Sequence, residues 1–233
     1  MASFVFVHGA FQGGWVWQKL SPLLRAQGHQ VHTPTLSGCG YLADANPPEI
    51  DLNRLIDDVN AFLQMEELND IVLVGHSFSG MICGALMMRC PERIRQAILV
   101  DALIPQTGRS FVEISGEQFA QMLEQHRRPD GLIRPWPAKV FGIPPETAPW
   151  FEQRLRPFSH QCFLTAFPED FDPHKVPTSY ITCTETMSPF IRTMALKAEG
   201  YNWPLSSLTT GHCPMITCPD ELAALMLAQL LPM

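Results

Sequence analysis

Ser77 stands where a sharp turn in the chain would expose its hydroxyl group. The stretch at residues 75–80, Gly-His-Ser-Phe-Ser-Gly, follows an apolar run (Ile71–Val74) and precedes a helix-forming segment. A serine at a tight strand-to-helix turn projects from the sheet beside the first amides of the helix, where it can act as a nucleophile. The spacing therefore predicts a serine nucleophile, although Ser79 replaces the second glycine of the common pattern.

A glycine-rich loop could supply the groups that stabilise a negative charge beside this serine. The loop at residues 8–15, His-Gly-Ala-Phe-Gln-Gly-Gly-Trp, directly follows the first apolar run. One of its backbone amides, paired with the amide of Phe78, would form an oxyanion hole for a tetrahedral intermediate. A phosphate-binding loop is the competing interpretation, but no Gly-Lys-Ser/Thr follows and the glycines lack the dinucleotide-binding spacing.

His212 is the histidine best placed to act as a base. It lies in the segment Thr-Gly-His-Cys-Pro-Met, after the last predicted strand and before the last predicted helix. A histidine there can reach the serine across the carboxyl edge of a sheet and serve as general base, then general acid. The pairs His29/His32 and His160/Cys162 lack a convincing third ligand, so no metal and no cofactor are expected.

The elements that must position these residues alternate between strand and helix. Such alternation predicts a parallel sheet with helices on both faces, and the near-continuous apolar strands fit burial on both sides. The helical patterns cover Val16–Gln27, Asp51–Gln64, Phe78–Arg89, Phe190–Glu199 and Glu221–Leu230. The six predicted strands are Ser3–Val7, Gln30–Pro34, Ile71–Val74, Ala97–Val100, Ser179–Cys183 and Leu205–Thr209.

The alternation is interrupted by a long insertion after the fourth strand, at residues 105–177. The insertion holds eleven of the 21 prolines and many aromatic residues, which excludes long helices but allows short ones such as Glu117–His126. Long insertions in compact domains are usually functional. We therefore predict a core of residues 1–104 and 178–233, with residues 105–177 as a cap over the site. A second small domain is the alternative.

Composition narrows the class of protein and its partners. The 233 residues fit one α/β domain, and a net charge of −7 argues against nucleic acid or an anionic membrane as partner. No secretory signal or bilayer-spanning apolar segment is evident. Seven scattered cysteines are typical of reduced thiols, so a cytoplasmic location is expected. The oligomeric state stays open, with a homodimer as one alternative.

Four motifs in order carry a resemblance to a known family: His8-Gly-Ala-x-x-Gly-Gly-Trp-x-Trp17, Leu36-Ser-Gly-x-Gly40, Val74-Gly-His-Ser-x-x-Gly-Met81 and Gly211-His-x-Pro-Met215. Together they resemble the α/β-hydrolase superfamily. More narrowly, they are similar to the plant methylesterase and hydroxynitrile lyase group and its bacterial esterase relatives. The resemblance implies that Ser77 is the nucleophile and His212 the base. It also implies that the amides of Ala10 and Phe78 form the oxyanion hole.

The carboxylate that should orient His212 is absent from the place that the resemblance implies. The acid of that group ends a segment like residues 180–186, where this chain has Thr186. Glu185 lies one residue earlier, and Asp101 ends the strand after the serine helix, as the acid does in some members of the superfamily. Both strand ends open onto the same edge of the sheet. We favour Asp101, with Glu185 and a dyad without a carboxylate as alternatives.

The leading hypothesis is a carboxylesterase-type serine hydrolase. It would cleave esters of a small apolar or aromatic substrate through an acyl-enzyme on Ser77, since the predicted cap is aromatic and poor in charge. A hydroxynitrile lyase is a second hypothesis. The lyases that the chain resembles carry Thr in place of Gly9 and Lys in place of Cys213, which favours the esterase. A catalytically silent ligand-binding homologue is the third hypothesis.

Overall fold

A six-stranded parallel sheet forms the centre of the computed structural model, which describes residues 1–45 and 49–231. Its strand order is β2-β1-β3-β4-β7-β8, and every neighbouring pair is parallel. The predicted fold class, a six-stranded parallel sheet, is confirmed. The strands are β1 (Ser3–Val7), β2 (Gln30–His32), β3 (Ile71–His76), β4 (Ile94–Val100), β7 (Thr178–Cys183) and β8 (Leu205–Leu208).

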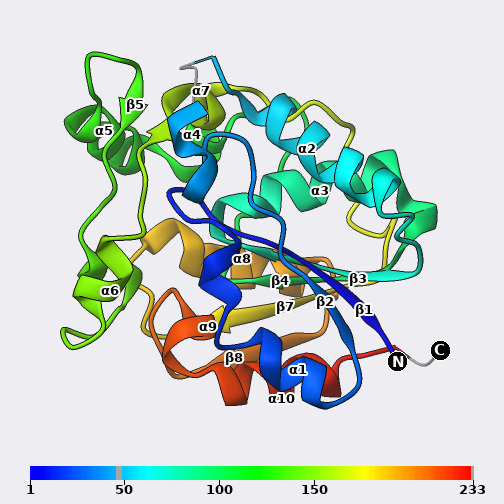
Figure 1. Ribbon diagram of the computed structural model, residues 1–233. Helices are drawn as coiled ribbons and strands as arrows, with labels where there is room; N and C mark the ends of the chain where they lie inside the picture. The colour runs from blue at the N-terminus through cyan, green and yellow to red at the C-terminus, as the bar shows by residue number, and fades with distance from the viewer. Residues whose placement is uncertain (46–48, 232–233) are drawn as a thin grey trace.

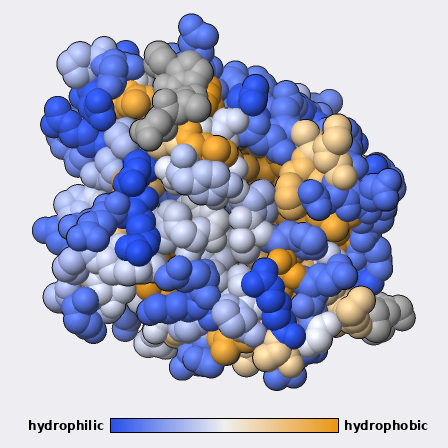
Figure 2. Space-filling view, in the orientation of Figure 1, coloured by the Kyte–Doolittle hydropathy of each residue, from blue (hydrophilic) through white to orange (hydrophobic). Residues whose placement is uncertain are grey.

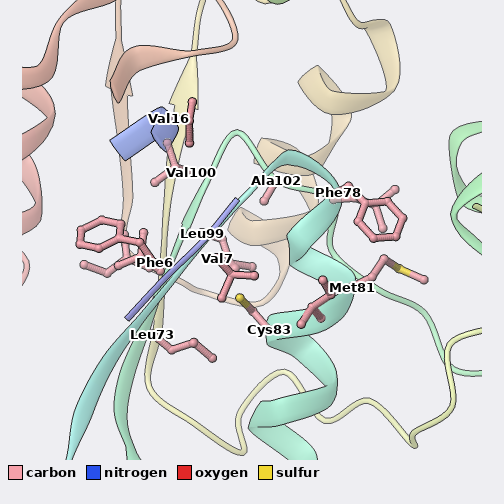
Figure 3. Packing of buried hydrophobic residues seen from close by; sticks show 14 of the residues in the cluster. Phe6, Val7, Val16, Leu73, Phe78, Met81, Cys83, Leu99, Val100 and Ala102 are labelled. Carbon is pink, nitrogen blue, oxygen red and sulfur yellow. The ribbon is translucent and has the colours of Figure 1, made fainter. Parts of the chain in front are cut away.

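The two central strands are buried on both faces. Every residue of β3 is buried, as are six of the seven residues of β4. Figure 3 shows Leu73 and Leu99 of these strands close to Cys83, which belongs to helix α3 (Gly80–Arg89). An added Cβ at Gly75 would lie only 2.7 Å from the Sγ atom of Cys83. The glycine therefore lets α3 pack directly on β3, and this contact fixes the helix that follows Ser77.

Helices cover both faces of the sheet. Figure 1 shows α2 (Leu52–Met65) and α3 on one face, and α1 (Ser21–Ala26) and α10 (Pro219–Ala228) on the other. Apolar residues recur along one stripe of α2, and the side chain of Asp51 caps this helix by accepting from the amide of Arg54 at 2.9 Å. Helix α8 (Pro189–Gly200) packs against β7, and α9 (Pro214–Thr217) follows the loop that carries His212.

The segment between β4 and β7 consists of short elements, as its prolines predict. Figure 1 shows its green part beyond the end of the sheet towards which the strands run, while its last residues return beside α3. The predicted helix Glu117–His126 is present with these bounds as α5. The division between core and cap stays a prediction. The other elements are α4 (Phe111–Ser115), β5 (Leu132–Ile133), η5 (Ala138–Phe141), α6 (Ala148–Glu152), β6 (Phe158–Ser159) and α7 (His160–Leu164).

The surface in the view of Figure 2 is largely hydrophilic, with apolar residues in small patches between polar ones. Large exposed apolar side chains such as Tyr41, Met65 and Leu196 are far apart in the sequence. Across residues 1–45 and 49–231, no helix combines the length and the apolar character needed to cross a bilayer.

Candidate active site

Ser77 lies at the turn between β3 and α3, in the short helix η3 (Ser77–Ser79). Its φ angle is 58°, in the left-handed region that side chains other than glycine rarely adopt. The side chain of Ser79 stabilises this turn: its Oγ accepts from the amide of His76 at 2.7 Å and donates to the carbonyl of Val7 at 2.8 Å. A glycine at position 79 could make neither bond, so the departure from the common pattern ties the turn to β1.

His212 lies between Ser77 and Asp101 in a continuous chain of hydrogen bonds. The Oγ atom of Ser77 is 2.8 Å from His212 Nε2, and His212 Nδ1 is 2.7 Å from Asp101 Oδ2. A carboxylate can only accept, so Nδ1 carries the proton and Nε2 accepts from the serine hydroxyl. A base that is oriented in this way can take the proton of Ser77.

Asp101 is held rigidly directly after β4. It is fully buried, and its φ angle of 44° is again in the left-handed region. Its Oδ1 accepts from the amide of Cys183 at 3.0 Å, while Oδ2 accepts from His212. A buried carboxylate without partners would be strongly destabilised. Both oxygen atoms of Asp101 are therefore used, one to fix the carboxylate and the other to orient the imidazole.

The end of β7, where the resemblance places the acid, is built differently. The side chain of Glu185 is exposed, and its backbone amide donates to the carbonyl of Thr210 at 3.0 Å. Thr186 is buried, but its Oγ1 has no hydrogen-bond partner among the described residues. The structure thus brings Asp101 to His212 and leaves Glu185 facing solvent.

The loop after β1 is held by two of its own side chains. The Nδ1–H group of His8 donates to the carbonyl of Gly9 at 2.9 Å, and Gln12 Oε1 accepts from the amide of Gly9 at 3.2 Å. Burial lowers the pKa of His8 to about 4, so its Nε2 is free to accept from the amide of Leu36. A peptide unit is planar and trans, so fixing the Gly9 carbonyl turns the amide of Ala10 away from His8.

The predicted oxyanion-hole residues, Ala10 and Phe78, both line one cavity together with Ser77. The amide of Phe78 belongs to the first turn of a helix, where amides lack an acceptor within the helix. A side chain at position 9 would crowd Ser77, since a Cβ added to Gly9 would lie 3.0 Å from the Cβ of Ser77. The oxyanion hole itself stays a prediction.

His76 contacts His212, and sequence reasoning did not predict this contact. Its Nε2–H group donates to the backbone carbonyl of His212 at 2.7 Å, and the two rings are 4.7 Å apart. Burial is the main cause that holds the pKa of His76 well below its usual range, and the nearby His212 is the second cause. The ring of His76 is therefore neutral. The sequence signal was its place at the end of a fully buried strand, where a polar ring requires a partner.

The cavity above Ser77 is small, at about 60 Å³, and mainly aromatic. Its polar lining comes from Ser77, Ser188 and His212, and no Asp, Glu, Lys or Arg occurs among the described residues that line it. Such a lining favours uncharged apolar ligands. Eight aromatic residues contribute: Phe11, Phe78, Phe111, Phe119, Trp136, Phe141, Phe163 and Phe190.

Cys213, the residue after His212, is not a competing candidate nucleophile. Its side chain is completely buried, and its Sγ accepts from Gln12 Nε2 at 3.6 Å. Burial raises the pKa of this thiol, so the reactive thiolate is not formed near neutral pH.

Comparisons with known proteins identify relatives of this chain. A model of the family described as "Alpha/beta hydrolase family" matches residues 4–225. A carbendazim hydrolyzing esterase of Nocardioides sp. (strain SG-4G) is 32% identical over 241 residues, covering 96% of this chain and 97% of the esterase. Salicylic acid-binding protein 2 of Nicotiana tabacum is 34% identical over 175 residues, covering 72% of this chain and 62% of the plant protein.

A solved structure shows the same fold over the whole chain. An extracellular alpha/beta-hydrolase from a Paenibacillus species has a TM-score of 0.85, with 98% of each chain covered and 23% sequence identity. At this identity the likeness is evidence of fold alone.

Proposed function

The chain belongs to the α/β-hydrolase family, and from this membership we propose that it is a serine esterase with Ser77 as nucleophile, His212 as base and Asp101 as acid. The observation that carries the proposal is the unbroken chain of hydrogen bonds, 2.8 Å from Ser77 to His212 and 2.7 Å from His212 to Asp101. Esterases among the relatives support the same reaction class.

The proposed reaction begins with attack of Ser77 Oγ on the carbonyl carbon of the ester. His212 Nε2 takes the hydroxyl proton, and the carboxylate of Asp101 stabilises the imidazolium that forms. The amides of Ala10 and Phe78 stabilise the oxygen anion of the tetrahedral intermediate. His212 then donates the proton to the leaving alcohol, which gives an acyl-enzyme on Ser77.

Water completes the cycle. His212 removes a proton from a water molecule, and the resulting hydroxide attacks the acyl carbonyl. The second tetrahedral intermediate collapses when His212 returns the proton to Ser77 Oγ, releasing the carboxylic acid. These steps use only groups of the chain and water.

The proposed substrate is a small, uncharged ester with an apolar or aromatic part. Its support is the cavity, in which aromatic side chains surround Ser77 and the described lining offers no ionic partner for a carboxylate or phosphate. The names of two relatives, a carbendazim hydrolyzing esterase and a plant methylesterase, are consistent with a small ester as substrate.

A cytoplasmic location is part of this proposal. All seven cysteines lie in the described residues as free thiols, and six of them are buried. Free thiols in this number are typical of a reducing compartment.

Stopped-flow hydrolysis of p-nitrophenyl butyrate tests the proposal. We expect a burst of about one p-nitrophenol per active site followed by slower turnover, since acylation precedes deacylation. Ser77→Ala should abolish the burst and reduce turnover by about 10³-fold or more. Ser207→Ala is the control, because Ser207 is exposed on β8 and is not among the residues that line the cavity.

Three results would contradict the proposal. The first is wild-type turnover in Ser77→Ala, and the second is the absence of any reaction of the wild type with a panel of acetyl, butyryl, benzoyl and methyl esters. Cleavage of mandelonitrile without turnover of any ester would instead assign a lyase.

A further inference from the structure

The insertion reaches the loop of His212 through the backbone. Gly142, which follows the turn η5, lies against Gly211, the residue before His212. A Cβ added to Gly142 would be 2.5 Å from the Cα of Gly211 and 3.0 Å from the amide nitrogen of His212. A Cβ added to Gly211 would likewise be 2.5 Å from the Cα of Gly142. Neither residue has room for a methyl group, so the two backbones are in direct contact.

The turn that presents Gly142 is anchored within the insertion. Gly142 has a φ of 70°, a left-handed conformation that ends the η5 helix, and its amide donates to the carbonyl of Lys139 at 3.1 Å. At the other end of the turn, the amide of Ala138 donates to Glu152 Oε1 at 2.8 Å. Phe141 adds a side-chain contact, because its ring lies 6.5 Å from the ring of His212 at an angle of 28°. Phe141 and Gly142, at the end of this turn, therefore cover His212.

The loop of His212 is thus held from two sides. The core side contributes His76, which donates to the carbonyl of His212 at 2.7 Å. The insertion contributes Gly142, which lies close to the amide of His212. These contacts fix both peptide units that flank the Cα of the base. A displacement of about 1 Å can reduce turnover about 10²-fold, so restraint of this kind has a large kinetic effect.

We propose that Gly142 is a positioning residue for His212. Close packing of its backbone against the Gly211–His212 peptide holds the imidazole within hydrogen-bond distance of both Ser77 and Asp101. The proposal rests on the proposed function of His212 as general base. It also gives residues 138–142 a role in turnover, in addition to covering the cavity.

The first test compares Gly142→Ala with Gly108→Ala. Both glycines belong to the insertion and have left-handed φ angles, 70° and 69°, so the backbone strain of the two substitutions is matched. Of the two, only Gly142 has a close neighbour: apart from the residues adjacent in the chain, no described residue lies within 4 Å of a Cβ placed at Gly108. We expect Gly142→Ala to reduce kcat for p-nitrophenyl butyrate about 10²-fold, with KM within about twofold of wild type. Gly108→Ala should leave kcat within about twofold of wild type.

A milder pair of variants serves if Gly142→Ala fails to fold. Glu152→Ala removes the acceptor of the Ala138 amide and loosens the turn at an exposed side chain, without contact to His212. Glu152→Gln keeps an acceptor oxygen. We expect a roughly three- to tenfold loss of kcat in Glu152→Ala and nearly wild-type kcat in Glu152→Gln. The proposal would be overturned if Glu152→Ala and Glu152→Gln both had the kcat of the wild type. It would also be overturned if folded Gly142→Ala had the wild-type kcat, or if Gly108→Ala lost as much kcat as Gly142→Ala.

Proton NMR of the His212 Nδ1–H group separates this proposal from the proposed function. The proton lies in the 2.7 Å bond to Asp101 and should give a low-field resonance in the wild type. We expect the resonance to shift or broaden in Gly142→Ala and to stay unchanged in Gly108→Ala. If the resonance behaves in this way while the wild type hydrolyses no ester, the function fails and the positioning role stands. An identical resonance in both variants rejects the positioning role, whether or not esters are hydrolysed.

Discussion

Strands β4 and β7 are hydrogen-bonded neighbours that end at the same edge of the sheet, but the residues that follow them differ in structure. After β4, Asp101 is fully buried and both carboxylate oxygens accept hydrogen bonds. After β7, Glu185 is exposed, and the hydroxyl of buried Thr186 has no partner in the described part of the chain. Proximity along a sheet edge therefore does not by itself make a carboxylate available to His212. Burial, backbone conformation and a second bond to the carboxylate decide which strand end orients His212.

The largest effect should come from Asp101→Asn. The amide can donate a hydrogen bond, so His212 would adopt the tautomer in which Nε2 carries the proton and cannot accept from Ser77. We expect kcat for p-nitrophenyl butyrate to fall by about 10³- to 10⁴-fold. Circular dichroism checks that the variant is folded. More than a tenth of wild-type kcat in the folded variant would show that the end of β4 is not the source of the acid.

A smaller effect on stability should come from Thr186→Val. The two side chains have similar shapes, and the unpartnered hydroxyl of Thr186 is replaced by a methyl group. Removing an unsatisfied buried polar group should raise the free energy of unfolding by about 1 kcal/mol, measured by urea denaturation. Thr184→Val is the control, because the exposed Thr184 donates to the carbonyl of Leu208 at 3.3 Å. A loss of stability in Thr186→Val would mean that its hydroxyl has a partner in solution.

The smallest effect should come from Glu185→Gln. Neither a hydrogen bond nor an ion pair connects the carboxylate of Glu185 to another described residue, and its side chain is exposed. We expect kcat to stay within about twofold of wild type, and the double variant with Asp101→Asn to be no slower than Asp101→Asn alone. A large loss in Glu185→Gln, together with a mild effect of Asp101→Asn, would exchange the roles of the two strand ends.

The sheet was the most predictable part of the molecule. Strands that are buried on both faces are largely apolar, so β1, most of β3 and the second half of β4 (Ala97–Val100) are visible as short apolar runs without knowledge of their neighbours. The short helix Glu117–His126 could also be predicted within the proline-rich insertion, in a stretch that contains no proline.

The sequence alone left two main candidates, Asp101 and Glu185, for the carboxylate that orients His212. The left-handed φ of Asp101 and the direction of Glu185 depend on how the strand ends are packed, which neither residue encodes locally. The contacts of His76 and Gly142 with the loop of His212 were not foreseen for the same reason. Each joins segments that are distant in the sequence, and their register is set by tertiary packing.

The wide spacing of the site along the chain has a consequence for folding. Ser77 and His212 are 135 positions apart, and Gln12 and Cys213 are 201 apart. Contacts between such distant positions require closure of long loops and therefore form late in folding. During synthesis the chain emerges with its N-terminus first, so β1 and β3 leave the ribosome long before the loop of His212. The nascent protein therefore carries the proposed nucleophile without the proposed base until the 135 positions from Ser77 to His212 have been synthesised.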